Sequence, residues 1–231
     1  MKKVLIIIPA YNEAENIERV VENIINNFPQ YDYVVVNDGS NDDTRKICKN
    51  KNYNLLDLPV NLGLAGAVQS GMKYANFHGY DYAVQIDGDG QHLPEYIEAM
   101  LSTMEETQCD IVIGSRFKSK KKPFTLRMLG SQIITGAIFI TTKGKYIGDV
   151  TSGMRLFNKS MIKRFGYQIN YGPEPDTLAY LINCGINIQE VQVEMKERIA
   201  GTSYLNVGNA IKYMIHMLFA ILIFQWFRVR R

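Results

Sequence analysis

Short runs of apolar residues alternate along the first half of the chain with segments whose apolar positions recur every three or four residues. The apolar runs, which predict buried strands, cover residues 4–8, 33–36, 55–58, 82–86 and 111–113. Helical spacing covers residues 17–28, begins again after Asp42 and Asp43, and returns over 63–78 and from Pro94 to about 106. Asn12 and Glu15 predict an N-cap and capping box for the first of these helices. Because the strands are nearly continuous apolar runs, the pattern predicts an α/β fold, a mostly parallel sheet with helices on both faces.

Polar loops follow three of the predicted strands at their carboxyl ends. These loops contain residues 11–13, 37–40 and 87–92. In sheets of this kind, ligands bind outside the carboxyl ends of the strands. The loops therefore predict one shared site. Three unrelated helix caps are the alternative, and they would explain the Asn and Asp residues but not a metal-type acidic pair.

The third loop, residues 87–92, reads Asp-Gly-Asp-Gly-Gln-His and carries the most specific chemistry of the chain. Asp87 and Asp89 lie one residue apart, a spacing that suits a hard divalent cation such as Mg²⁺ or Mn²⁺ shared with substrate phosphates. The glycines allow a sharp turn and the close approach of a bulky anion. Asp-Gly pairs also form ordinary turns, so the loop alone leaves a metal–diphosphate site and a plain turn both open.

The composition is that of a globular enzyme of ordinary size. Of 231 residues, 46% are hydrophobic and 21% charged, which allows a full core and excludes extended disorder. A net charge of +3 is too small to indicate a nucleic-acid partner. Cys48, Cys109 and Cys184 are scattered and form no CxxC motif, which favours a reducing compartment. The N-terminal apolar run is short and meets Pro9, so a buried strand is favoured over a signal peptide.

Six motifs occur in order along the chain, at residues 9–13 (Pro-Ala-Tyr-Asn-Glu), 36–40 (Val-Asn-Asp-Gly-Ser), 61–63 (Asn-Leu-Gly), 87–92, 114–117 (Gly-Ser-Arg-Phe) and 151–155 (Thr-Ser-Gly-Met-Arg). Together they resemble glycosyltransferase family 2, in particular the polyprenyl-phosphate glycosyltransferases similar to dolichol-phosphate mannose synthase. The resemblance spans roughly residues 4 to 203. Within that family, the chain is similar to the short bacterial transferases that make undecaprenyl-phosphate N-acetylglucosamine. It implies a GT-A fold, a nucleotide-sugar donor, Mg²⁺ or Mn²⁺, and an inverting transfer to a lipid phosphate.

The resemblance also implies roles for individual residues. The base and ribose pocket would contain Pro9, Tyr11, Glu13 and Asp38. The donor diphosphate would be contacted by Asp87, Asp89 and Arg198, with Asp89 and Gln91 as metal ligands. Arg116 would lie near the acceptor phosphate. Many relatives have a lysine where this chain has Leu64, which puts a side-chain contact from that position to the nucleotide in question.

The acceptor decides which catalytic groups are needed. A phosphate monoester is already anionic near neutral pH, so it needs arginines for positioning, and the candidates are Arg116, Arg127 and Arg155. Each could instead be a surface residue or a structural ion-pair partner. A hydroxyl acceptor would need a general base. The candidates for that role are Glu174 and Asp176, while Asp149 is another acid on the acceptor side, or a cap. His92 is a phosphate or metal neighbour, or a hydrogen-bonded structural residue.

The second half of the chain adds a basic and apolar pattern typical of a membrane surface. A lysine-rich run at 118–124 precedes the apolar segment 126–142, in which only Arg127 is charged. A solvated loop before a core helix is the alternative. Residues 213–227 are apolar all round but shorter than the roughly 20 residues of a span. Trp226 and the following arginines suit a headgroup boundary.

These features predict a catalytic domain over residues 1–205, including an amphipathic interface helix at about 126–142, and a membrane-associated helix over 206–231. The expected reaction transfers a sugar from UDP-N-acetylglucosamine, or next from UDP-glucose, to undecaprenyl phosphate at the cytoplasmic face of the plasma membrane, for cell-wall or surface polysaccharide synthesis. A small membrane protein and a second copy of the chain are candidate partners. Two alternatives stay open: a soluble transferase acting on a polysaccharide hydroxyl, and a non-catalytic nucleotide-binding subunit.

Overall fold

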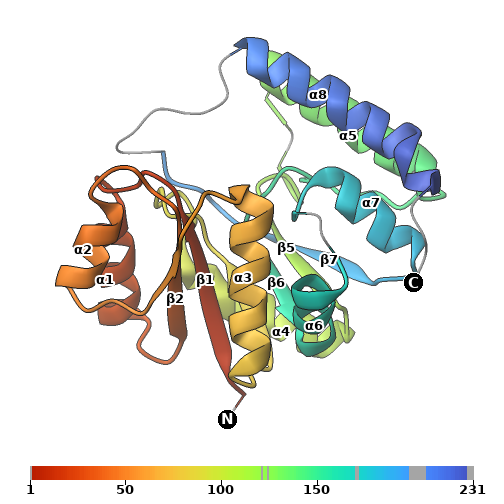
Figure 1. Cartoon of the computed structure of the whole chain (residues 1–231). Helices are drawn as coiled ribbons and strands as arrows, with labels where there is room; N and C mark the ends of the chain where they lie inside the picture. The colour runs from red at the N-terminus through yellow and green to blue at the C-terminus, as the bar shows by residue number, and fades with distance from the viewer. Residues whose placement is uncertain (1, 121, 124, 170–171, 198–206, 228–231) are drawn as a thin grey trace.

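The computed structural model contains a seven-stranded sheet flanked by helices on both faces (Figure 1). It describes residues 2–120, 122–123, 125–169, 172–197 and 207–227, without the side chains of residues 126, 127, 207–211 and 226. The strands are β1 (Val4–Ala10), β2 (Asp32–Asp38), β3 (Leu55–Leu58), β4 (Tyr82–Gln85), β5 (Ile111–Ser115), β6 (Arg155–Asn158) and β7 (Ile188–Gln192). The helices are α1 (Ile17–Asn27), α2 (Thr44–Asn50), α3 (Gly63–Phe77), α4 (Ile97–Thr107), α5 (Leu126–Thr141), α6 (Lys159–Tyr167), α7 (Pro175–Asn183) and α8 (Val207–Leu222), with 3₁₀ turns at Pro94–Tyr96 and Phe224–Phe227.

The strand order is β3-β2-β1-β4-β6-β5-β7. All neighbouring pairs are parallel except those of β6, which runs antiparallel between β4 and β5 and places Arg155 opposite Gln85. The predicted α/β fold with a mostly parallel sheet is therefore confirmed. Because β6 is reversed, its first residue lies at the edge where the parallel strands have their carboxyl ends.

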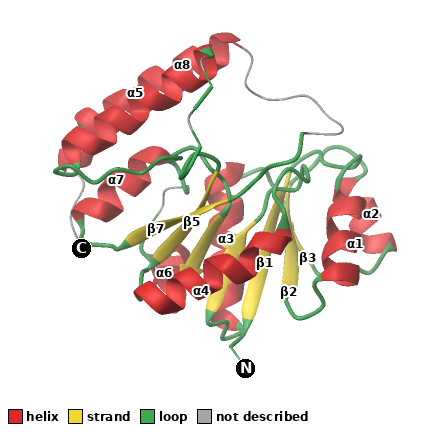
Figure 2. Cartoon of the chain, turned by 180° about the vertical axis from the view of Figure 1, so that it is seen from behind, coloured by secondary structure: helices red, strands yellow, loops and turns green. Residues whose placement is uncertain are grey.

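Successive residues of β1 enter two separate cores, as the strand period of two requires. Leu5 and Ile7 join the core under α3 and α6, whereas Ile6 and Ile8 join the core under α1 and α4. Figure 2 shows α4 in front of the strands, with α3 and α6 behind them. Burial on both faces explains why the strand is a continuous apolar run.

The predicted capping box of Asn12 and Glu15 is wrong. The first helix begins at Ile17 with Asn16 as its N-cap. Asn12 has a φ of 56° and lies in a loop, where its backbone N–H donates to Ser40 Oγ and its Oδ1 accepts from the Asn41 N–H. These bonds between the β1 and β2 loops take the place of a helical cap.

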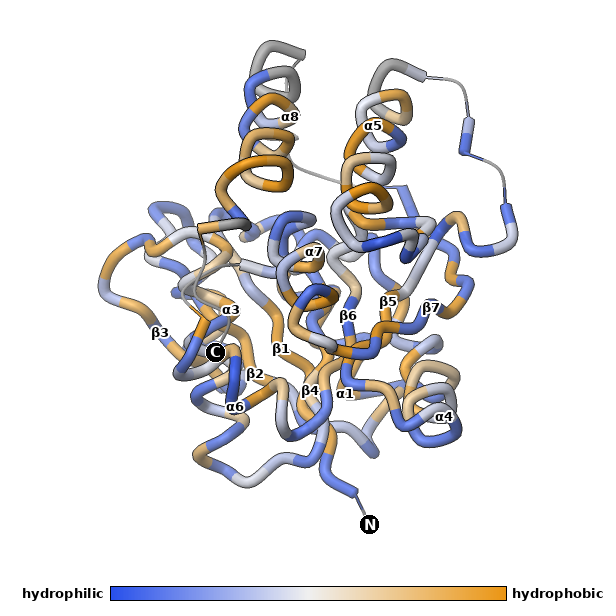
Figure 3. Tube along the Cα trace, turned by 90° about the vertical axis from the view of Figure 1, so that its right-hand side faces the viewer, coloured by the Kyte–Doolittle hydropathy of each residue, from blue (hydrophilic) through white to orange (hydrophobic). Residues whose placement is uncertain are grey.

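Helices α5 and α8 pack against each other beyond the carboxyl edge of the sheet, and α8 also packs against α7. Ile134 and Ile138 of α5 and Met217 and Ile221 of α8 are buried in the core that includes α3 and α6. The outward side chains form an exposed apolar surface, which we call the α5–α8 surface: Leu129, Ile133, Ile140, Ile215, Phe219 and Leu222. Figure 3 shows both helices standing beyond the sheet with hydrophobic residues along them. Within the described residues, no helix combines the length and apolar composition needed to cross a membrane.

Candidate active site

A cavity of about 770 Å³ lies at the carboxyl edge of the parallel strands. Its wall is assembled from the ends of β1, β2 and β4, the starts of α3, β6 and α7, and one residue of α8. The lining residues with polar or charged side chains are Tyr11, Glu13, Asp38, Asn61, Gln85, Asp87, Asp89, Thr151, Ser152, Arg155, Glu174 and Tyr213. We call this the donor cavity, because it brings together most residues predicted to bind the nucleotide sugar, including Pro9.

Close contacts between loops hold the first side of the donor cavity. Glu13 N–H donates to Thr44 Oγ1 at 2.9 Å, which ties the end of β1 to the start of α2. Asp38 is buried and its Oδ1 accepts from the Leu62 N–H at 2.7 Å, which fixes the turn into α3. Between them, Gly39 has a φ of +64°, and a Cβ there would lie 2.6 Å from the backbone N of Asn61. This position therefore requires glycine.

The Asp87–Asp89 loop is held by its own side chains and by Gly153. His92 Nδ1 accepts from the Asp87 N–H at 3.0 Å, so that nitrogen carries no proton, and the buried ring serves to position the loop. This is the structural alternative considered for His92. Asp89 Oδ1 accepts from the Gln91 N–H at 3.0 Å. A Cβ on Gly153 would lie 2.8 Å from Asp87 Oδ2, so only glycine lets the β6 side approach the carboxylate.

The donor set fits a divalent cation that is shared with a substrate. Asp87 and Asp89 both line the donor cavity, with Asp89 buried and the Asp87 side chain 38% exposed. Among the described residues, no group of three or more His, Cys, Asp and Glu residues gathers to form a complete protein cage. Two carboxylates are what Mg²⁺ or Mn²⁺ takes from a protein when diphosphate oxygens and water complete its shell. The Gln91 side chain, predicted as a ligand, instead donates to the Lys196 carbonyl at 3.4 Å.

Gln85 is a residue of the site that the sequence reasoning missed. It is fully buried, lines the donor cavity, and its Nε2 donates to Asp87 Oδ1 at 3.1 Å. Its Oε1 is buried without a hydrogen-bond partner, which is costly unless a ligand supplies a donor. The signal was present in the sequence, since a lone amide interrupts the apolar strand between Val84 and Ile86.

Arg155 provides a buried cation on the wall of the donor cavity. Its Nε donates to the Ser152 carbonyl at 3.0 Å and its Nη2 to the Val150 carbonyl at 3.1 Å. Burial lowers its pKa to about 10, against the raising effect of Glu174 and other nearby acids, so the guanidinium is charged at neutral pH. A fixed cation in the same cavity as two carboxylates suits an anionic ligand that binds together with a divalent cation.

Arg116 and Asp149, both predicted as catalytic, form a structural ion pair and are not among the described residues that line the donor cavity. Arg116 Nε donates to Asp149 Oδ2 at 2.7 Å and its Nη2 donates to Oδ1 at 2.9 Å. Burial alone would raise the pKa of Asp149, but the hydrogen bonds and charge of Arg116 outweigh it and hold that pKa below its ordinary value. The Arg116 side chain is 25% exposed, so one edge faces solvent.

A second cavity of about 790 Å³, which we call the basic cavity, lies beside α5. It is lined by Phe117, Lys118, Ser119, Lys120, Lys122, Gln132, Thr135, Gly136, Phe139 and Tyr146. Lys122 Nζ donates to Ser131 Oγ and Thr135 Oγ1 at 3.0 and 3.2 Å, and burial lowers its pKa. The charged groups of Arg116 and Lys122 both lie over the Phe117 ring, at 5.2 and 5.7 Å from its centroid.

The remaining predicted residues differ in where they lie. Glu174 lines the donor cavity and accepts a hydrogen bond from the Tyr213 hydroxyl of α8, whereas Asp176 is buried in the first turn of α7. Leu64 also lines the cavity. The side chain of Arg127 and the whole of Arg198 lie outside the described residues.

Known proteins share this sequence and fold. Residues 5–166 match the family described as glycosyl transferase family 2. A UDP-N-acetylglucosamine–dolichyl-phosphate N-acetylglucosaminyltransferase of Methanococcus voltae is 31% identical over 94% of this chain and 96% of that protein. An undecaprenyl-phosphate mannosyltransferase of Micrococcus luteus is 28% identical over 90% of this chain and 91% of that protein.

Among solved structures, glucosyl-3-phosphoglycerate synthase from Mycobacterium tuberculosis, in complex with Mn²⁺ and UDP-glucose, matches with a TM-score of 0.68. The match covers 96% of this chain and 79% of that one at 16% identity, so it supports the fold, of the expected GT-A type. The family match covers well over half of the chain, and the Methanococcus voltae relative exceeds 30% identity over nearly all of it. The chain therefore belongs to glycosyl transferase family 2 and is a glycosyltransferase.

Proposed function

We propose that the protein transfers a sugar, with inversion, from a UDP-sugar to a polyprenyl phosphate. The observation that carries this proposal is the charge arrangement of the donor cavity. Asp87 and Asp89 form a cation-binding pair on one wall, and the buried guanidinium of Arg155 lies on another. A nucleoside diphosphate needs both, because its phosphates are anionic and it leaves carrying a bound divalent cation.

In this proposal, the base and ribose occupy the side formed by Pro9, Tyr11, Glu13 and Asp38. Asp89, joined by Asp87, holds Mg²⁺ or Mn²⁺, which supplies neutralisation of charge on the departing diphosphate. Gln85 keeps the Asp87 carboxylate oriented through its Nε2 hydrogen bond. Gln91 acts as a ligand only if its side chain leaves Lys196.

UDP-N-acetylglucosamine is the first candidate donor and UDP-glucose the second. The Methanococcus voltae relative, which aligns over nearly the whole chain, is named for UDP-N-acetylglucosamine and dolichyl phosphate. The unpartnered Gln85 Oε1 could accept a hydrogen bond from a hydroxyl or N–H of the bound donor.

The acceptor phosphate is proposed to approach from the side of the basic cavity. Lys118, Lys120 and Lys122 give that cavity a positive lining, and Phe117 joins it to the exposed edge of Arg116. Charge of this kind attracts a phosphate monoester and raises its local concentration. Both named relatives act on polyprenyl-type phosphates, with dolichyl and undecaprenyl chains respectively. Undecaprenyl phosphate stays our first choice of acceptor.

The α5–α8 surface is proposed to rest on the membrane that holds the acceptor, at the cytoplasmic face of the plasma membrane. It exposes six large apolar side chains on two helices whose buried faces belong to the core. An exposed apolar patch beside a basic run suits an anionic lipid interface. A small membrane-protein partner could share this surface.

The test is a matched panel of donors and acceptors with the full-length protein. UDP-N-acetylglucosamine, UDP-glucose and GDP-mannose are each incubated with Mn²⁺ or Mg²⁺ and with undecaprenyl phosphate, dolichyl phosphate or free undecaprenol. We expect a lipid-linked sugar, read by mass, from a UDP donor and a phosphate acceptor, and none from the alcohol. The proposal fails if neither UDP-sugar yields a lipid product, or if the alcohol serves equally well.

A hydroxyl acceptor is the second candidate, because Glu174 lies on the donor cavity where a general base could act. The variant Glu174→Gln separates the two functions. Transfer to a phosphate acceptor should persist in this variant, because a phosphate needs no deprotonation, whereas transfer to a hydroxyl should be abolished.

A further inference from the structure

One hydrogen bond joins the C-terminal helix to the donor cavity. The hydroxyl of Tyr213, in α8, donates to Glu174 Oε2, and Glu174 is the N-cap residue of α7. Both side chains line the cavity. Burial raises the pKa of Tyr213, and the Glu174 carboxylate raises it further, so the phenol stays protonated as the donor.

Glu174 has a second potential partner in the same cavity. The Arg155 guanidinium is buried there, and among nearby acids Glu174 has the largest effect on its pKa. Arg155 already donates through Nε and Nη2 to the Ser152 and Val150 carbonyls, so its position is fixed. An ion pair between the two residues would therefore form by rotation of the flexible Glu174 side chain and not by movement of Arg155.

An ion pair between Glu174 and Arg155 would compete with a bound diphosphate. A carboxylate and a phosphate both seek the same guanidinium, and inside a cavity such pairs are stronger than in water. We infer that Tyr213 is a positioning residue, which holds the Glu174 carboxylate away from Arg155 and so leaves that guanidinium to the donor diphosphate. The inference rests on the proposed function, since it takes the ligand of the donor cavity to be a nucleoside diphosphate.

Because of this hydrogen bond, the affinity of the donor cavity depends on the packing position of α8. Met217 and Ile221 anchor α8 in the core against α5, and Tyr213 lies one helical turn before Met217. Tyr213 reaches Glu174 only when α8 is docked. Donor affinity is thereby linked to the helix that carries half of the α5–α8 surface.

The experiment measures the binding of UDP in the presence of Mn²⁺ by calorimetry, with the full-length protein and no acceptor. Tyr213→Phe removes the hydroxyl and keeps the ring, and we expect UDP to bind on the order of tenfold more weakly, a change that corresponds to about 1.4 kcal/mol. Adding Glu174→Gln to Tyr213→Phe removes the competing charge and should restore most of the affinity. Tyr167→Phe, on the exposed side of α6, is the matched control and should bind UDP as the unaltered protein does.

The outcomes separate the inference from the proposed function. If the unaltered protein does not bind UDP with Mn²⁺, the proposed function fails and the inference with it. If it binds UDP but Tyr213→Phe binds equally well, the inference alone is overturned. If the double variant stays as weak as Tyr213→Phe, Tyr213 acts through packing only and the inference is again overturned. Because rescue by Glu174→Gln is the deciding result, some loss of stability in Tyr213→Phe does not affect the test.

Discussion

The pair Arg116–Asp149 gives the sharpest test of the structure, because both residues were predicted to be catalytic and the structure joins them in a buried ion pair. In Arg116→Ala, the Asp149 carboxylate would keep two hydrogen bonds, from the residue 116 backbone N–H at 3.0 Å and the Thr151 hydroxyl at 3.1 Å. The carboxylate is fully buried and would lose its hydrogen-bonded countercharge, so that Lys122 and Arg155 remain as the cations that act on it. We therefore expect Arg116→Ala to destabilise the fold, whatever it does to turnover.

The magnitude follows from the geometry. Removing one partner of a buried ion pair costs about 3–5 kcal/mol. The remaining hydrogen bonds, and the 25% exposure of the Arg116 side chain, place this case at the lower end, at about 3 kcal/mol. Arg45 and Asp57 provide a matched control at the surface, since their Nε–Oδ2 distance is 2.6 Å but the Arg45 side chain is 59% exposed. Arg45→Ala should cost less than about 1 kcal/mol.

The assay is chemical unfolding of Arg116→Ala, Asp149→Asn and the double variant. The double variant should be more stable than Arg116→Ala, because the asparagine removes the uncompensated charge. The pH dependence has a definite sign. In the unaltered protein the pKa of Asp149 is lowered, so its stabilisation is complete above the unfolded pKa of about 3.9 and is lost below it. In Arg116→Ala burial raises that pKa, so the stability gap should be widest near pH 7 and narrow towards about pH 4.

A loss in Arg116→Ala no larger than that in Arg45→Ala would refute this reasoning. So would a double variant that is less stable than Arg116→Ala, or a stability gap that does not change with pH. Arg116 would then be available for a role in catalysis.

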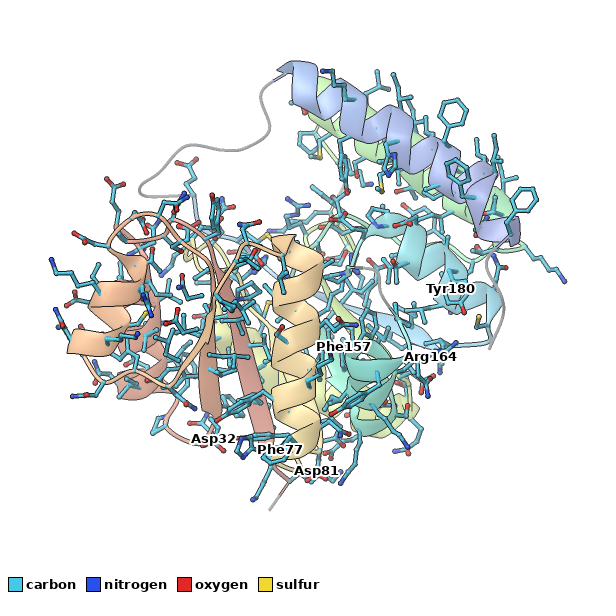
Figure 4. All side chains as sticks on the ribbon, in the orientation of Figure 1. Asp32, Phe77, Asp81, Phe157, Arg164 and Tyr180 are labelled. Carbon is cyan, nitrogen blue, oxygen red and sulfur yellow. The ribbon has the colours of Figure 1, made fainter. Side chains whose placement is uncertain are left out.

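Three further predictions test the site and the surface. Asp89→Asn should lower metal-dependent turnover by at least about a hundredfold without lowering the melting temperature. The control Asp81→Asn, at the opposite edge of the sheet in Figure 4, should keep its turnover, and equal activities of the two variants would remove the metal role. Gly153→Ala should weaken the binding of UDP and Mn²⁺ by displacing the Asp87 carboxylate, and Gly136→Ala, where a Cβ meets nothing within 4 Å, is its control; unchanged affinity would contradict the close approach. Phe219→Ser should weaken the affinity for vesicles of anionic phospholipid, measured by sedimentation, by about tenfold. The control Phe77→Ser, at a residue 82% exposed at the far end of α3 in Figure 4, should keep that affinity, and equal affinities would place the membrane contact elsewhere.

The parallel part of the sheet could be predicted because its signal is local. Strands buried on both faces are continuous apolar runs, and β3 has the predicted bounds of residues 55–58. Strand β6 gave no such signal, since its four residues begin with a buried arginine and end with an asparagine. Its place between β4 and β5 depends on pairing with residues far along the chain, such as Gln85 with Arg155. Helices α6 and α7 and strand β7, which come after β6 in the chain, were not predicted either.

The site divides in the same way. Asp87 and Asp89 were predicted from their spacing and their place after a strand, and both line the donor cavity. Tyr213 could not be predicted, because it meets Glu174 only through the packing of α8 on α5 and α7. The pairing of Arg116 with Asp149 could not be predicted for a related reason, because the two residues lie 33 positions apart in the chain.

The tight fit at Gly153 limits how this enzyme could change over evolutionary time. A methyl group at that position would lie 2.8 Å from Asp87 and 3.0 Å from His92, so neither chance substitution nor design can easily enlarge that wall. Leu64 and Pro173 line the cavity from the start of α3 and the residues before α7, where a changed side chain alters the lining itself. A lineage that acquired a different sugar would therefore have rewritten the α3 and α7 side and kept the glycine, and a designer who wants a new donor should begin there.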